Sequence, residues 1–264
     1  MARHAAALRG EWAVVTGASS GLGREFAVQL ARMGMHVAAA ARRTDRLETL
    51  KQEIEGSCGT RVTPVTVDLS TDEGVRELHR TVTDAGIEPL VLVNNAGFGL
   101  HGGFLSIDWE RERSMLNLDI VSLVHLTRLF ASDMAARGRG YIVQVASIAA
   151  YQSAPRYASY AAAKAFVLHH GGAVHHELRG SGVSVTVVSP GVTATEFQEV
   201  AGQEPTLYTR LAMMPADRVV RAGLSAMVRR RMSVVPGLLN KVSMAFVRLI
   251  PRSLAARAAR AMMR

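Results

Sequence analysis

The chain has 264 residues, 48% of them hydrophobic, and a formal net charge of +9. This length is enough for one large domain with a substantial core, and the single cysteine, Cys58, excludes an internal disulfide or a cysteine-based metal cluster. No apolar run reaches the length of a membrane span, and the N-terminal residues lack a signal-peptide core. We therefore expect a single cytoplasmic domain behind a short flexible tail, residues 1–9.

The positive charge is concentrated at one end of the chain. Residues 1–204 hold 19 Lys and Arg against 21 Asp and Glu, whereas residues 205–264 hold 12 basic residues against one acidic residue, Asp217. This distribution argues against nucleic-acid binding over the whole surface. It predicts one basic element at the C-terminal end.

A glycine-rich turn lies between the first predicted strand, residues 11–16, and the first predicted helix, residues 24–33. Such a turn lets the backbone approach a pyrophosphate, whose charge the helix N-terminus stabilises. A plain structural loop would also use glycines, but the strand–turn–helix context favours nucleotide binding. The candidate cofactor ligands in the turn are Gly17, Ser19, Ser20, Gly21, Leu22 and Gly23.

The second predicted strand, residues 35–41, ends at two arginines. An acidic residue near this position would bind the ribose hydroxyls of NAD, whereas Arg42 and Arg43 suit the 2′-phosphate of NADP. The alternative is a pair of solvated arginines at the start of a helix.

A helix over residues 44–55, capped by Thr44, and a strand over 61–67 follow. Asp68 stands at the end of this strand. It either meets the adenine edge of a nucleotide or caps the helix predicted over 71–85, and the two roles stay open.

The fourth predicted strand, residues 89–93, leads into an amide-rich turn that contains Asn94, Ala96 and Gly97. Such a turn can hold neighbouring backbone and approach a cofactor ribose. A long helix over residues 108–136 follows, with Asn117 in its interior. Because Asn is a poor helix former, we expect it to kink the helix or hold a water.

The central stretch runs from a buried strand, residues 141–146, into an alanine-rich helix. Ser147 follows the strand, at the edge where parallel sheets bind ligands. Tyr160 and Lys164 are four residues apart, so they share one helix face. A cation beside a phenol favours the phenolate, which suits Tyr160 to acid–base work and Ser147 to donation to a substrate oxygen. Without other motifs, the same spacing also fits an ordinary amphipathic face.

The remaining chain repeats the strand–helix alternation. The helix continues to residue 178 with four histidines that lack the spacing of a helical zinc site, so we expect no metal and interpret them as a surface or subunit face. A sixth strand over residues 183–188 precedes four candidate cofactor ligands: Pro190, Gly191, Thr193 and Thr195. Residues 196–214 are predicted to form a mobile lid, residues 215–230 a helix and residues 232–235 a last strand.

Alternating strands and helices predict an α/β fold with a doubly wound parallel sheet of the Rossmann type, in one domain over residues 10–235. The motifs above, in this order and at these spacings, resemble the short-chain dehydrogenase/reductase family, in its ordinary soluble branch. The resemblance covers about residues 10–235.

The resemblance implies a role for each matching residue. Tyr160 exchanges a proton with the substrate oxygen, Lys164 lowers the pKa of Tyr160 and bonds the nicotinamide ribose, Ser147 orients the carbonyl, and Asn117 anchors a water relay to Lys164. Arg42, supported by Arg43, would bind the 2′-phosphate, although the family's NADP-binding members often carry a further basic residue where this chain has Ser20. The segment after Pro190-Gly191 and Thr195 would contact the nicotinamide carboxamide. A homodimer or homotetramer is implied in the same way.

Residues 236–264 depart from the family's usual ending. Apolar residues recur at helical spacing with basic residues between them: Leu238, Val242, Ala245, Phe246, Leu249 and Ile250, then Leu254, Ala255, Ala258 and Met262. This pattern resembles a basic amphipathic helix on a membrane surface. The alternative is a helix that covers the substrate cleft or another subunit. Both interpretations indicate a lipophilic substrate, and the ending also resembles family subgroups that act on acyl chains or steroid-like ketones.

We therefore expect an NADP-dependent oxidoreductase, with NAD as the alternative cofactor, that interconverts a ketone or aldehyde and an alcohol. The competing hypothesis is a catalytically idle NADP-binding sensor or scaffold that acts through its basic tail. The joint presence of Asn117, Ser147, Tyr160 and Lys164 favours catalysis.

Overall fold

The computed structural model describes the chain apart from residues 1–6, 203–212, 248 and 263–264. The predicted flexible tail does not extend to residue 9. Leu8 is buried in the core, and the Gly10 amide donates to the Gly34 carbonyl at 2.8 Å. Most of the predicted lid lies outside the described residues, and its beginning forms the short helix α8 (Phe197–Ala201).

The described part of the chain contains one seven-stranded parallel sheet with the order β3-β2-β1-β4-β5-β6-β7. This sheet confirms the predicted doubly wound α/β fold. The strands are β1 (Trp12–Thr16), β2 (His36–Ala41), β3 (Val62–Thr66), β4 (Pro89–Asn94), β5 (Gly140–Val145), β6 (Val183–Val188) and β7 (Ser233–Val234).

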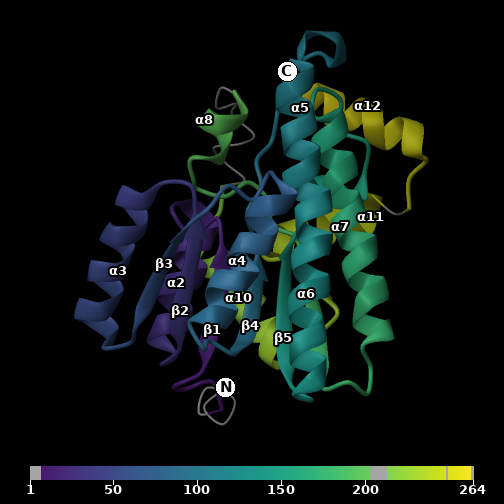
Figure 1. Ribbon diagram of the computed structural model, residues 1–264. Coiled ribbons are helices and arrows are strands. Elements are labelled where there is room, and N and C mark those ends of the chain that lie inside the picture. The colour runs from purple at the N-terminus through teal and green to yellow at the C-terminus, as the bar shows by residue number, and fades with distance from the viewer. Residues whose placement is uncertain (1–6, 203–212, 248, 263–264) are drawn as a thin grey trace.

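Helices cover both faces of the sheet (Figure 1). Because side chains alternate along a strand, Val14 and Val15 of β1 enter different cores: Val15 packs in a cluster with Phe26, and Val14 in a cluster with Phe130. The first face carries α2 (Gly21–Arg32), α3 (Thr44–Cys58) and α10 (Ala216–Val228), and the second carries α4 (Asp72–Asp84), α6 (Leu123–Ala136) and α7 (Ala158–Glu177).

The strand order reverses between β1 and β4. The connection after β1 leads to one side of the sheet, and the connection after β4 leads to the other. The carboxyl ends of these two strands therefore leave a crevice, which is where open α/β sheets bind ligands.

The helix predicted over residues 108–136 is not continuous. It consists of α5 (Trp109–Leu116), a π-helical segment η2 (Asn117–Ser122) and α6. The irregularity expected at Asn117 is thus a wider helical turn that begins at this residue. Asp108 caps α5 through a hydrogen bond from the Arg111 amide to its carboxylate, at 3.0 Å.

The predicted cap at Thr44 is wrong, and one of the two roles left open for Asp68 is excluded. Thr44 is the first residue of α3, and its hydroxyl hydrogen bonds with the Thr66 hydroxyl instead of a helix amide. Helix α4 is capped by Thr71, which accepts from the Gly74 amide at 3.0 Å, so Asp68 does not have that role.

The C-terminal extension forms two helices, α11 (Leu238–Val247) and α12 (Arg252–Met262). Met244, Ala255 and Ala259 face inward and are buried, whereas Leu238 and Leu249 are 78% and 81% exposed. The predicted amphipathic region therefore turns a few apolar residues toward the protein and leaves others exposed: Leu238, Leu239, Val242, Phe246, Leu249 and Leu254.

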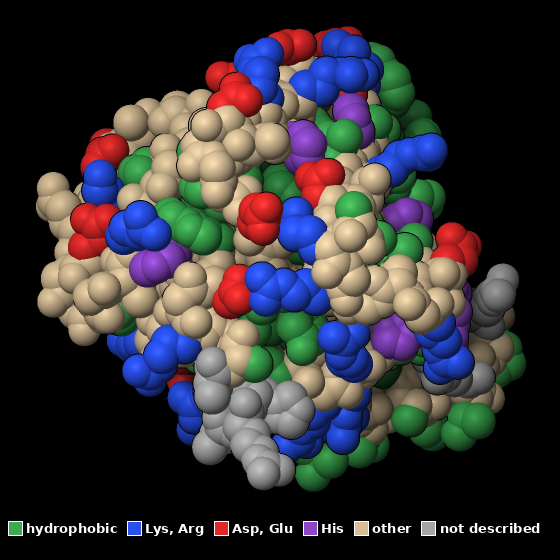
Figure 2. Space-filling view, turned by 60° about the horizontal axis from the view of Figure 1, so that its bottom comes forward, with side chains coloured by type: hydrophobic (Ala, Val, Ile, Leu, Met, Phe, Trp, Pro, Cys, Tyr) green, Lys and Arg blue, Asp and Glu red, His purple; other side chains and the backbone are tan. Residues whose placement is uncertain are grey.

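Charges on the molecular face shown in Figure 2 are mixed. Blue Lys and Arg side chains alternate there with red Asp and Glu side chains, without one continuous basic patch on that face. No helix in the described part of the chain combines the length and the apolar character that a membrane crossing requires.

Candidate active site

A pocket of about 460 Å³ opens at the carboxyl ends of the strands. Its volume is within the usual range for a small-molecule site. Most of the predicted site residues line it: Gly17, Ser19, Ser20, Gly21, Leu22, Arg42, Arg43, Asp68, Ala96, Gly97, Ser147, Tyr160, Lys164, Pro190, Gly191, Thr193 and Thr195. Gly23, Asn94 and Asn117 are not among the lining residues.

The glycine turn is closely packed against the turn that follows β4. A Cβ atom on Gly17 would lie 2.7 Å from Asn95 Nδ2, and one on Gly23 would lie 2.2 Å from the Gly17 carbonyl oxygen. Thr16 joins the two turns, because its hydroxyl accepts from the Asn95 and Ala96 amides, each at 3.0 Å. Glycine at these positions therefore leaves a backbone cradle of the kind that holds a pyrophosphate.

Asn94 and Asn95 have different positions. The Asn94 amide is buried and donates to the Thr127 hydroxyl at 3.0 Å, so it ties β4 to α6 instead of facing the pocket. Asn95 donates to the Thr16 carbonyl at 3.0 Å and lines the pocket. The sequence analysis selected Asn94, whereas the structure places Asn95 at the pocket, because two adjacent amides look alike in the sequence.

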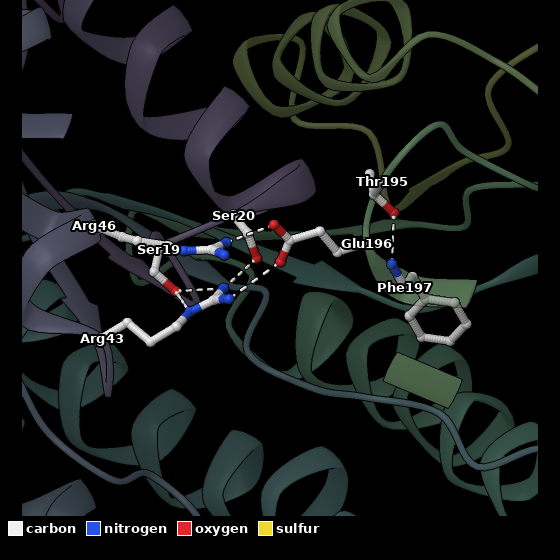
Figure 3. Close-up of polar contacts among 7 residues, drawn as sticks. All are labelled: Ser19, Ser20, Arg43, Arg46, Thr195, Glu196 and Phe197. Carbon is white, nitrogen blue, oxygen red and sulfur yellow. Dashed lines mark hydrogen bonds and ion pairs between the residues drawn. The ribbon is translucent and has the colours of Figure 1, made fainter. Parts of the chain in front are cut away.

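The arginine that enters the polar network of the pocket is Arg43. Its guanidinium donates to the Ser19 hydroxyl at 3.0 Å, to the Ser20 hydroxyl at 2.7 Å and to the Glu196 carboxylate at 3.1 Å (Figure 3). Arg46 also pairs with Glu196, and both arginines lower the pKa of this carboxyl through hydrogen bonds. The geometry thus favours Arg43, where the sequence analysis favoured Arg42.

Asp68 lies at the rim of the pocket, where its Oδ1 accepts from the Ser70 amide at 3.0 Å and from the Ser70 hydroxyl at 2.8 Å. Of the two roles that the sequence left open for Asp68, helix capping is excluded, because Thr71 caps α4. The other role, contact with the adenine edge of a nucleotide, stays a prediction.

Ser147, Tyr160 and Lys164 come together inside the pocket. Ser147 follows β5, and its Oγ accepts from the Ala149 amide at 3.1 Å. Tyr160 and Lys164 are both buried on α7, one turn apart, and Ser147 and Tyr160 form a side-chain hydrogen bond. The Lys164 ammonium lies 5.7 Å from the centre of the Tyr160 ring. A phenol, a hydroxyl and a cation thus share one small volume.

The expected depression of the Tyr160 pKa is wrong for this structure. Burial raises the pKa of Tyr160, the neighbouring Asp119 carboxylate raises it further, and the Ser147 hydrogen bond offsets only part of this. The phenol is therefore held in its protonated form, which is the form that donates a proton.

Asp119 is a buried carboxylate that the sequence analysis did not select. Its Oδ2 lies 3.0 Å from the Lys164 ammonium, and the side chain is 0% exposed. The sequence feature that could have identified Asp119 is its position: it is an acidic residue between the apolar residues Leu118 and Ile120, two positions after Asn117. Glu196 was missed because its partners are about 150 residues away in the chain.

Aromatic side chains form the wall beyond Tyr160. The Tyr160 ring packs 5.3 Å from Phe197 and 5.8 Å from Tyr157, whose ring is in turn 5.0 Å from His101. Burial raises the pKa of Tyr157 to about 12, so this phenol is also neutral. Ala259 of α12 reaches the pocket from the C-terminal extension. This end of the pocket is predominantly apolar.

The fold is that of a nucleotide-binding α/β protein, and its pocket brings Ser147, Tyr160 and Lys164 together. The family model for short chain dehydrogenases matches residues 11–206. The chain therefore belongs to the short-chain dehydrogenase family and is an oxidoreductase of that family.

Two of its relatives are named for lipid substrates. The chain is 34% identical over 218 residues to 17-beta-hydroxysteroid dehydrogenase type 3 of Rattus norvegicus, a match that spans 81% of this chain and 68% of the relative. It is 32% identical over 222 residues to the very-long-chain 3-oxoacyl-CoA reductase of Pyricularia oryzae, over 82% and 64% of the two chains. This chain thus spans about two thirds of the length of these relatives.

A solved structure shares the architecture. A short-chain dehydrogenase from Sphingobium yanoikuyae in complex with NADPH has 28% sequence identity and a TM-score of 0.79, with 92% of this chain and 97% of that chain covered.

Proposed function

We propose that this enzyme interconverts a lipophilic ketone or aldehyde and its alcohol, with NADP as the preferred cofactor and NAD as the alternative. The observation that carries the proposal is the joint placement of Ser147, Tyr160 and Lys164 at the end of a glycine-lined cradle. The names of the relatives, a steroid dehydrogenase and a long-chain acyl reductase, support the choice of substrate class.

The residues fit a nicotinamide dinucleotide. Gly17 and Gly23 leave no room for a Cβ, which suits close approach of the pyrophosphate. Arg43, which follows β2, and Ser19 and Ser20 of the turn after β1 form a cluster of donors that suits the 2′-phosphate. Pro190, Gly191, Thr193 and Thr195 also line the pocket, with Thr195 packed against Gly21 of the glycine turn, and these four residues are the proposed contacts of the nicotinamide end.

NADPH, when bound, supplies the hydride that reduces the carbonyl carbon. The Ser147 hydroxyl orients the carbonyl oxygen, and the Tyr160 hydroxyl transfers its proton to that oxygen as negative charge develops on it. The Lys164 ammonium, buried beside the ring, stabilises the phenolate that remains. In the direction of alcohol oxidation, the same phenolate accepts the hydroxyl proton. Asn117, at the start of the π segment, is the proposed anchor of a water that links Lys164 to solvent.

The test of this chemistry is Tyr160→Phe. Turnover should fall by at least about a thousandfold because the ring stays and the transferable proton is lost. NADPH binding, followed by fluorescence titration, should change less than about threefold. A variant with normal turnover would refute the assignment of Tyr160.

The substrate class is tested with a panel of ketones of increasing chain length. We expect kcat/KM to rise with length, because each buried methylene contributes about 0.8 kcal/mol in an apolar site. A flat or falling series would exclude a lipophilic substrate.

We further propose that α11 contacts a membrane surface from the cytoplasmic side. The uncovered side chains of Leu238, Val242 and Phe246 lie beside the exposed Lys241, which is the arrangement of an interfacial helix. In a flotation assay with anionic liposomes, Phe246→Asp should lower the bound fraction. Arg61→Ala, on the opposite end of the fold, serves as the control variant.

A homodimer or homotetramer is the other arrangement that would cover this surface. Light scattering of the full chain and of Phe246→Asp distinguishes the two outcomes. Loss of an oligomer in the variant, with unchanged liposome binding, would assign the α11 surface to a second copy of the chain.

A further inference from the structure

Asp119 is a buried acidic residue that the proposed reaction has not used so far. It lies in the π-helical segment η2, and its side chain is 0% exposed. Its Oδ1 accepts a hydrogen bond from the Phe98 amide at 3.2 Å, and its Oδ2 lies 3.0 Å from Lys164 Nζ. The carboxylate thus joins the turn after β4 to the lysine on α7.

The Lys164 ammonium has few other partners among the described residues. Its side chain is 6% exposed, and Nζ donates to the Val145 carbonyl at 3.3 Å. A buried cation without an opposite charge is strongly disfavoured, so the carboxylate determines whether the ammonium stays charged in this place. Asp119 is the acidic side chain described within ion-pair distance of it.

The wider turn of η2 is what brings the two groups together. In this segment Leu118 lines the pocket while the next residue, Asp119, is turned into the interior and pressed against the Gly97 backbone. A Cβ atom on Gly97 would lie 2.4 Å from Asp119 Oδ1, so the glycine leaves the space that the carboxylate occupies. The Phe98 amide and Lys164 contact its two oxygens and orient the side chain toward the lysine.

We propose that Asp119 is a positioning residue that keeps the Lys164 ammonium charged and fixed beside Tyr160. The inference rests on the proposed function, because it concerns the lysine of the same acid–base centre. Asp119 acts through Lys164.

The groups that face this centre come from several elements. Ser147 and Tyr160 share a hydrogen bond, Tyr157 packs against Tyr160, and His101 with its neighbour Arg156 lies behind Tyr157. Burial raises the pKa of Asp119, an effect that the charge of Lys164 opposes. The negative charge of Asp119 in turn raises the pKa of Tyr160.

The first test measures stability and does not depend on activity. Lys164→Met should lower the Tm by about 5 °C or more, because it leaves a buried carboxylate unpaired. Adding Asp119→Asn in the same chain should restore part of that loss, since the unpaired charge is removed. If the double variant loses as much Tm as Lys164→Met and Asp119→Asn lose separately when added together, the inference is overturned. This result does not depend on which reaction the enzyme catalyses.

The second test is the pH profile of ketone reduction by Asp119→Asn. Reduction needs a protonated Tyr160 and a charged Lys164. The charge of Asp119 raises the pKa of Tyr160, so loss of the carboxylate lowers it. The basic limb of the profile therefore moves toward lower pH, by about one pH unit or more. An unchanged limb in a folded variant would overturn the inference.

The matched control is Ser122→Ala in the same segment. Ser122 is also buried, and its hydroxyl donates to the Leu69 carbonyl, so the variant loses a buried hydrogen bond without touching Lys164. It should lower the Tm and leave the basic limb in place. An equal shift of the limb in Ser122→Ala would assign the effect to general loosening of η2 and overturn the positioning role. The two proposals can fail separately. Normal turnover by Tyr160→Phe, together with partial recovery of the Tm when Asp119→Asn is added to Lys164→Met, would refute the proposed function and leave the ion pair supported.

Discussion

The preference for NADPH over NADH should depend on Arg43. Its guanidinium is half-exposed and is shared among Ser19, Ser20 and Glu196. Charge-assisted hydrogen bonds to a phosphate contribute about 1.5–3 kcal/mol, or roughly 10- to 100-fold in affinity. Because NADH lacks the phosphate, Arg43→Ala should lower NADPH affinity by this factor and leave NADH affinity within about threefold.

Glu196 competes with the phosphate for the same guanidinium. An ion pair at 40% side-chain exposure contributes at most about 1 kcal/mol, so displacing the carboxylate costs little. Glu196→Gln should therefore tighten NADPH binding by up to about fivefold, and it should not change NADH binding. The same gain should be seen with 2′,5′-ADP, which carries the phosphate without the nicotinamide.

Fluorescence titration of both cofactors into wild type, Arg43→Ala, Arg42→Ala and Glu196→Gln measures these effects. Arg42→Ala is the matched control, since it removes the same charge from the neighbouring position. Equal losses of NADPH and NADH affinity in Arg43→Ala, or weaker NADPH binding in Glu196→Gln, would refute the reasoning.

Three further predictions concern the cradle, the aromatic wall and pH. Gly23→Ala should lower both the Tm and NADPH affinity, because the new methyl group would lie 2.2 Å from the Gly17 carbonyl oxygen; normal binding by a folded variant would show that the turn can yield. Phe197→Ala should reduce kcat/KM about five- to thirtyfold for a long-chain ketone and less for acetone, as an aromatic contact of about 1–2 kcal/mol is lost. Burial and the nearby Arg61 lower the pKa of His36 in the folded chain. The unfolded chain therefore binds more protons, and the stabilisation is complete above about pH 6.5 and is lost as the pH falls through the lowered pKa. His36→Gln should flatten the fall in Tm between pH 7.5 and 5.5, and an unchanged slope would contradict this assignment.

Much of the fold was determined by local sequence patterns. The predicted bounds of β6, Val183–Val188, agree with the structure at both ends, and every residue of this valine-rich strand is buried, including Ser184 and Thr186. The glycines of the turn after β1 and the spacing of Tyr160 and Lys164 are also local. The glycines are needed for the close packing of the turn backbone, and the four-residue spacing follows from the period of the helix. A short segment of sequence is enough to show both.

Tertiary structure decided the electrostatics of the site. The sequence placed a cation one helical turn from a phenol, but it contained no sign that Asp119, from another helix, would pair with that cation at 3.0 Å. It likewise favoured Arg42 over Arg43 and Asn94 over Asn95, because the sequence does not show in which direction each of two adjacent side chains points at the end of a strand. Charge interactions depend on distances between segments far apart in the chain, and only the packing of the sheet and its helices sets those distances.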